Sequence, residues 1–136
     1  MSTLILHLPL ALPGPHTEYR YTLTLDGHSA SGHASARAAL LPPAGETVAV
    51  VPARALSWQR VTLPQGVGAQ SPRLRAVLEG LLEERLLDDP AALHFALPPQ
   101  APTASPVWIA ICDRAWLRAA LQALETAGRP VARVVP

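Results

Sequence analysis

Residues 107–136 read VWIAICDRAWLRAALQALETAGRPVARVVP, and this stretch decides the fold class. Residues 107–111 form a short, continuous apolar run, which is typical of a strand that is buried on both faces. Asp113 precedes apolar residues at helical spacing, and a glycine and a proline end that pattern. Residues 131–135 then predict a last strand. A strand, a helix and a strand in succession normally form a right-handed crossover between parallel strands, so the stretch predicts an α/β fold.

The part of the chain before this stretch predicts six further strands. Residues 19–25 (YRYTLTL) alternate between polar and apolar side chains and are followed by Asp26-Gly27, a tight-turn pair. Residues 47–51 form another continuous apolar run, so we expect this strand in the interior of a sheet. The remaining predicted strands are residues 3–8, 32–40, 58–63 and 93–97.

One amphipathic helix is predicted between these strands. Ser71 is a favourable N-cap, and Pro72 occupies the first helical position, where its missing N–H costs nothing. Apolar residues recur at helical spacing from Leu74 onward, and we expect the helix to run to about Leu87. Charged side chains occupy its other side.

Composition excludes several classes of protein. The 136 residues suit one domain, and 11 basic against 10 acidic side chains give a net charge of +1, which argues against a nucleic-acid-coating protein. Cys112 is the only cysteine, so no internal disulfide forms and a cytoplasmic location is favoured. The apolar start is interrupted by His7 and Pro9 and lacks basic residues, which argues against a secretory signal. No run of about 18 apolar residues predicts a membrane span.

Catalytic motifs are lacking, so we predict that the chain is not an enzyme and holds no cofactor. The five histidines show no metal-ligand spacing, and no HExxH, CxxC, GxxxxGK[ST] or GxGxxG motif occurs. Ser57, Ser71 and Ser105 have no nucleophile-elbow context. Cys112 has two interpretations: a thiol activated by a helix N-terminus, or, the one favoured, a small buried hydrophobe. Core or half-buried packing is expected for all three tryptophans.

Charged residues cluster on the predicted helix and just beyond it. Most such faces are merely solvated, and the alternative is a surface that docks a partner protein. We name this set the charged surface; it comprises Arg73, Arg75, Glu79, Glu83, Glu84 and Asp88.

Five segments, taken in order, resemble one protein family. They are residues 50–58 with 61–64 (VVPARALSW, VTLP), 81–84 (LLEE), 93–96 (LHFA), 112–117 (CDRAWL), and 127–130 with 134–136 (AGRP, VVP). Their order and spacing resemble the cytoplasmic region of type II secretion system protein L, GspL. The resemblance covers nearly the whole chain.

The resemblance implies an RNase H-like fold of the actin-like ATPase superfamily: a mixed sheet with an inserted small α/β subdomain. Residues 1–52 and 131–136 would form the first lobe, whose sheet would combine the first four predicted strands with the last one, and residues 53–130 would form the insert. The family pattern continues past Pro136 with a second lobe, a transmembrane helix and a periplasmic domain. We therefore expect this chain to be the first part of the cytoplasmic region of a single-pass inner-membrane protein.

The resemblance also implies a function. GspL proteins are non-catalytic adaptors on the cytoplasmic side of the inner membrane, where they recruit the N-terminal domain of the secretion ATPase GspE, beside GspM and GspF. Family members also tend to form homodimers. We expect the charged surface to contact GspE, with charges that set register and association rate and an aromatic or apolar anchor that the sequence does not identify.

Two alternatives stay open. A nucleotide-dependent actin-like assembly switch fits the fold, but residues 6–10 (LHLPL), where such proteins bind phosphate, contain a proline and no carboxylate. An RNase H-like nuclease would need several carboxylates around two metal ions, and among residues 19–51 only Asp26 is expected near the sheet, apart from Glu46 in a loop.

Overall fold

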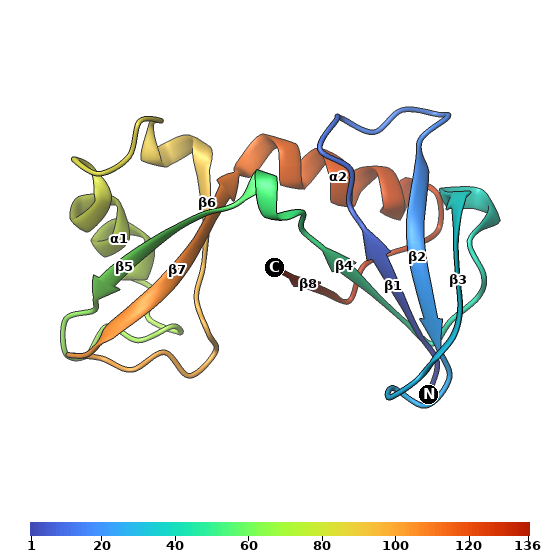
Figure 1. Ribbon diagram of the computed structural model, residues 1–136. Helices are drawn as coiled ribbons and strands as arrows, with labels where there is room; N and C mark the ends of the chain where they lie inside the picture. The colour runs from blue at the N-terminus through green and yellow to red at the C-terminus, as the bar shows by residue number, and fades with distance from the viewer. The chain divides into compact units, whose positions relative to one another are not determined.

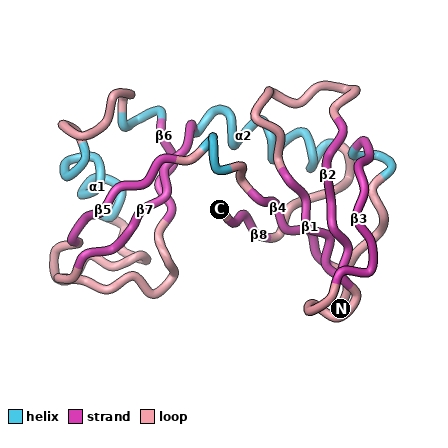
Figure 2. Tube along the Cα trace, viewed as in Figure 1, coloured by secondary structure: helices cyan, strands magenta, loops and turns pink.

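The computed structural model describes residues 1–136, and the chain divides into two compact units. The larger unit combines Met1–Ala55 with Trp116–Pro136, and the smaller unit is Leu56–Ala115. Figures 1 and 2 show that each unit is built around its own β-sheet. The smaller unit is therefore inserted in the sequence of the larger one.

The larger unit contains a mixed five-stranded sheet in the order β3-β2-β1-β4-β8. β1 pairs antiparallel with β2 and parallel with β4, and β4 pairs parallel with β8. The grouping of the first four predicted strands with the last one is thus confirmed, and β4 lies in the interior as expected. The strands are β1 (Thr3–His7), β2 (Glu18–Thr24), β3 (Ala30–Arg37), β4 (Glu46–Val50) and β8 (Arg133–Val135).

Helix α2 (Arg114–Thr126) completes the core of the larger unit. Its residues Leu117, Ala120 and Leu124 are buried, as are Leu4 and Leu6 of β1, because apolar side chains recur at period 3.6 on the helix and period 2 on the strand. Both ends of α2 are tied to neighbouring loops. The indole of Trp116 donates to the Leu10 carbonyl (2.9 Å), and the guanidinium of Arg129 donates to the carbonyls of Leu41 and Pro42.

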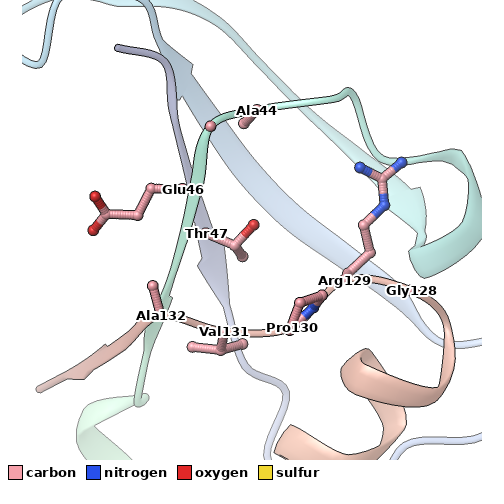
Figure 3. A pocket seen from close by; sticks show the side chains of 9 residues that line it. Ala44, Glu46, Thr47, Gly128, Arg129, Pro130, Val131 and Ala132 are labelled. Atoms are coloured by element: carbon pink, nitrogen blue, oxygen red, sulfur yellow. The ribbon is translucent and has the colours of Figure 1, made fainter.

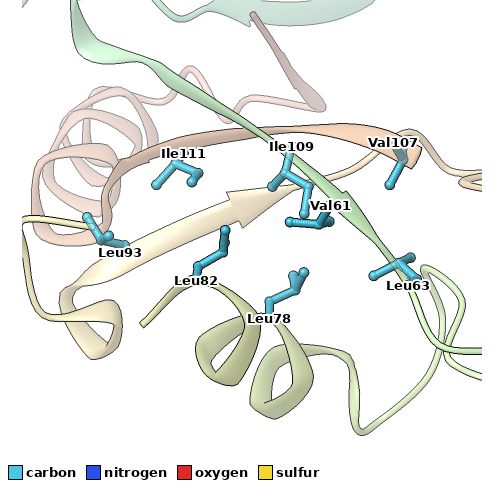
Figure 4. Close-up of a cluster of buried hydrophobic side chains, with 8 residues drawn as sticks. All are labelled: Val61, Leu63, Leu78, Leu82, Leu93, Val107, Ile109 and Ile111. Atoms are coloured by element: carbon cyan, nitrogen blue, oxygen red, sulfur yellow. The ribbon is translucent and has the colours of Figure 1, made fainter. Parts of the chain in front are cut away.

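The smaller unit contains an antiparallel three-stranded sheet in the order β5-β7-β6, with helix α1 (Leu74–Leu82) on one face. The strands are β5 (Ser57–Thr62), β6 (Leu93–Ala96) and β7 (Pro106–Asp113). Figure 4 shows α1 directing Leu78 and Leu82 toward Val61, Ile109 and Ile111 of the sheet. This cluster is a separate core, built from alternate residues of the strands and one stripe of the helix.

Three expectations differ from the structure. The helix predicted to reach Leu87 ends at Leu82, because the backbone turns after one further helical hydrogen bond, Leu86 N–H to the Leu82 carbonyl, and Arg85 binds the Arg60 carbonyl (2.8 Å). The parallel crossover is wrong, since β7 pairs antiparallel with β5 and β6 while β8 belongs to the other sheet.

The third difference concerns the insert. We expected it to span residues 53–130, whereas the units divide after Ala55 and after Ala115, so that most of α2 belongs with the larger sheet. Packing explains the difference, because the buried side of α2 and the hydrogen bonds of Trp116 and Arg129 belong to the larger unit.

Adjacent leucines of α1 test the smaller core. Leu82 is 0% exposed and Leu81 is 41% exposed, so the same substitution at these two neighbouring residues compares a buried side chain with an exposed one. We expect Leu82→Ala to lower the free energy of unfolding by about 2–5 kcal/mol, because it removes buried contacts and leaves a cavity. The matched control Leu81→Ala should cost less than about 1 kcal/mol in the same urea titration. Equal losses for the two variants would contradict this core.

Candidate functional site

The six residues of the charged surface do not share one helical face. Arg75 and Glu79 lie on α1, and Arg73 is the residue before it. The chain starts α1 later than predicted: Ser71 Oγ accepts a hydrogen bond from the Arg73 N–H (3.2 Å), but Leu74 is the first helical residue. The remaining members, Glu83, Glu84 and Asp88, lie in the turn that follows the helix.

Arg75 is occupied inside the smaller unit. Its guanidinium donates to the carbonyls of Pro90 (3.0 Å) and Leu93 (2.9 Å), and its Nε lies 3.1 Å from Glu79 Oε1. The same guanidinium lies 5.3 Å from the centre of the Phe95 ring, a cation–π arrangement. Arg75 therefore fastens the segment that leads into β6 to helix α1. Its role is structural, and it holds Glu79 beside it.

Four members of the charged surface are exposed to solvent. Arg73 lies before α1, and Glu83, Glu84 and Asp88 lie after it. Arg85, in the same turn, reaches the outer edge of β5 through its hydrogen bond to the Arg60 carbonyl. The turn after α1, which contains Glu83 and Glu84, therefore lies beside the β5 edge of the small sheet.

The opposite face of the small sheet carries two tryptophans. Register places Trp58 and Arg60 of β5 opposite Ala110 and Trp108 of β7, on the face away from α1. Trp58 is 47% exposed and Trp108 is 56% exposed, so the expectation that residues 107–111 are buried on both faces is wrong at Trp108. Trp116, on α2, is half-buried.

The apolar run hides this feature in the sequence. In β7, Val107, Ile109 and Ile111 face α1, while Trp108 and Ala110 face the other way, and all five are apolar. Because the pattern contains no polar residue at alternate positions, it does not distinguish an exposed face from a buried one. Arg60, directly opposite Trp108 on an edge strand, is a polar residue on the same face, but the structure is needed to pair the two residues.

A hollow of about 310 Å³ lies in the larger unit, lined by residues 44–47 and 128–132 (Figure 3). Its charged side chains are already engaged: Arg133 Nε lies 2.7 Å from Glu46 Oε1, and Arg129 is bound to backbone carbonyls. No group of three or more histidine, cysteine or acidic side chains in the structure could hold a metal ion. Both charged side chains that line the hollow are thus engaged by partners within the larger unit.

Asp26, the carboxylate considered for metal chemistry, belongs to a local turn. Its oxygens accept hydrogen bonds from the N–H groups of His28 (2.8 Å) and Ser29 (2.9 Å) and from the Ser29 hydroxyl (2.8 Å). These bonds, led by the one from the Ser29 backbone, hold the pKa of Asp26 well below its usual value. The carboxylate stabilises the turn between β2 and β3.

Cys112 and His94 are opposite each other in the small sheet. Burial, and next the neighbouring Asp113 carboxylate, raise the pKa of the Cys112 thiol, which is 6% exposed. Partial burial, followed by the charges of Arg114 and Arg75, lowers the pKa of His94. The favoured interpretation of Cys112 as a small buried hydrophobe is confirmed.

Thiol labelling tests this environment. We expect native Cys112 to react with a disulfide reagent at pH 7 about a hundredfold or more slowly than in the urea-unfolded chain, because reaction requires opening of the sheet. Comparable rates in the two states would show that the thiol is accessible and contradict its burial.

Neither α-helix has the length and hydropathy that crossing a bilayer requires.

Comparison with known proteins identifies the fold first. The cytoplasmic domain of EpsL, an inner-membrane component of the type II secretion system of Vibrio cholerae, is similar with a TM-score of 0.74 and 21% identity over the whole chain. A PilM–PilN type IV pilus biogenesis complex is similar with a TM-score of 0.57 and 12% identity over 98% of the chain. The chain spans 57% and 46% of those two chains, and no curated protein matches it.

The fold is thus that of the cytoplasmic part of a secretion-system component. The family model for type II secretion system protein L matches residues 24–136, and the chain belongs to that family. The family expected from the five sequence segments is confirmed.

Proposed function

We propose that this chain is a non-catalytic adaptor that binds the N-terminal domain of the secretion ATPase GspE on the cytoplasmic side of the inner membrane. The observation that carries the proposal is the family match over residues 24–136, supported by the likeness to the EpsL cytoplasmic domain. In the whole protein, GspM and GspF would be further partners, and a homodimer would be its oligomeric form. The RNase H-like, actin-like assignment of the larger sheet belongs to the same proposal.

The residues at the expected nucleotide position favour an adaptor over a nucleotide-dependent switch. Leu8 follows β1, is 3% exposed, and uses its N–H to bind the Val50 carbonyl (3.0 Å). Pro9 has no N–H, so the first turn offers neither a free backbone donor at these two positions nor a carboxylate for a metal ion.

Calorimetry tests the adaptor directly. We expect the N-terminal domain of the cognate GspE to bind the chain saturably, with the same dissociation constant in the presence and absence of ATP and Mg²⁺. Binding that requires nucleotide would support the assembly switch instead. No binding by the folded chain would contradict the proposal.

We propose that the charged surface is the part of the docking surface that orients the partner. Exposed charges affect register and association rate more than affinity, and an exposed ion pair contributes about 0–1 kcal/mol. Glu83 and Glu84 are the members best placed to act, because Arg75 and Glu79 are paired with each other.

Charge reversal tests this surface. Glu83→Arg/Glu84→Arg should slow association with GspE about three- to tenfold at low salt, and the effect should shrink as salt screens the charges. Glu18→Arg/Glu125→Arg makes the same change of net charge on exposed positions of the larger unit and is the matched control. If stopped-flow rates are the same for both variants and the parent chain, the turn after α1 is not part of the interface.

A further inference from the structure

The outer face of the small sheet, which is the face away from α1, carries residue types that are typical of protein interfaces. Trp58 and Trp108 are diagonal neighbours across β5 and β7, at a Cβ separation of about 7 Å, and Arg60 lies directly opposite Trp108. Their exposed indole surface is on the order of 200 Å², since each aromatic side chain presents about 150–250 Å². Tryptophan and arginine are the residues most enriched where protein interfaces concentrate their binding energy.

The tryptophans are not needed by the core of the smaller unit. That core lies on the α1 side of the sheet and is built from Val61, Ile109, Ile111 and their neighbours. Ala110, opposite Trp58, is 6% exposed, so the indoles surround a small residue and leave a shallow, apolar centre. Large apolar groups that stay exposed next to one another mark an interaction site more often than isolated ones do.

The edges of the sheet are less available than its face. On β5, the Arg60 carbonyl already accepts a hydrogen bond from Arg85 Nη1 (2.8 Å). On β6, the Leu93 carbonyl accepts one from Arg75 Nη2 (2.9 Å). A partner that added a strand to the β5 edge would displace Arg85, whereas a partner that covered the tryptophans would displace only water.

Charge indicates what kind of partner fits. The face away from α1 presents Arg60 and His94 and carries no carboxylate at any strand position of β5, β6 or β7. A second copy of this chain would bring two Arg60 guanidiniums together on an apolar centre, which is unfavourable. An apolar side chain flanked by a carboxylate would instead cover the indoles and pair with Arg60.

We propose that the Trp58–Arg60–Trp108 face is the anchor by which this chain holds GspE, and that it receives an apolar side chain flanked by a carboxylate. This inference rests on the proposed adaptor function and adds its anchoring contact. The charged turn after α1 would then lie at the rim, because Arg85 joins that turn to the β5 edge beside Arg60. A central anchor with a polar rim is the usual arrangement of a protein interface.

Three variants and one control test the anchor. Trp108→Ala and Trp58→Ala should each weaken binding of the GspE N-terminal domain about tenfold or more, mainly through faster dissociation. Arg60→Glu should weaken it at least as much, because it sets a carboxylate against the carboxylate of the partner. Leu40→Ala, which trims a 74% exposed side chain in the larger unit, should leave the dissociation constant unchanged.

A measurement on the parent chain removes any dependence on the folding of variants. In ¹H–¹⁵N spectra, the indole N–H signals of Trp58 and Trp108 should shift or broaden when GspE is added. The signal of Trp116, whose indole donates to the Leu10 carbonyl, serves as the internal reference and should not move.

The outcomes separate the two proposals. If GspE binds the parent chain while the Trp58 and Trp108 signals and the variant affinities stay unchanged, the anchor is overturned and the adaptor function remains. If the folded parent chain does not bind GspE, the adaptor function fails and the anchor fails with it. A dimer of the free chain that Trp108→Ala dissociates would assign the face to a second copy and would also overturn the proposal.

Discussion

The parallel pairing of β4 with β8 is the constraint on which the rest of the fold depends. The pairing joins Val48–Val50 to Arg133–Val135. The chain leaves the larger sheet after β4 and re-enters it as β8, the neighbouring strand. Arg133 and Glu46 form an ion pair beside the pairing (2.7 Å), and the Ala132 and Val51 N–H groups extend its hydrogen bonds (2.8 Å each). Neighbouring parallel strands need a long connection, so the chain between β4 and β8 has room for the smaller unit.

Arginine provides further long-range connections within each unit. Arg129 binds the Leu41 and Pro42 carbonyls in the larger unit, and Arg75 and Arg85 bind backbone carbonyls in the smaller one. A guanidinium carries five donors in a fixed plane, so one side chain satisfies two or more carbonyls of a loop or an edge strand. Arginine therefore holds the loops and edges of the smaller unit. The sheet face that carries Trp58 and Trp108 is not the face on which α1 packs.

The sequence predicts the sheet strands well because their patterns are local. Period-2 alternation and continuous apolar runs identify the strands, and a glycine and a proline mark the end of α2. Local pattern does not predict which sheet β7 joins, because β7, α2 and β8 satisfy the rule for a parallel crossover; only the family resemblance places residues 107–111 in the insert and the last strand in the larger sheet. The sequence also does not predict that α1 ends at Leu82, because Arg85 binds the carbonyl of Arg60, which is 25 positions away in the chain.

The candidate site is predicted less well than the fold. The charges of α1 are visible in the sequence, but the involvement of Arg75 with Pro90 and Leu93 depends on the loop that α1 packs against. The exposure of Trp108 depends on which face of β7 receives a helix, and a run that is apolar at every position carries no information on that choice.

Hydrogen exchange of the complex with the GspE N-terminal domain tests the central claim, that this chain is an adaptor which binds through the smaller unit. The account predicts slower amide exchange in residues 57–62 and 106–111 on binding, equal with and without ATP and Mg²⁺. Protection confined to the larger unit, or protection that appears only with nucleotide, would contradict it.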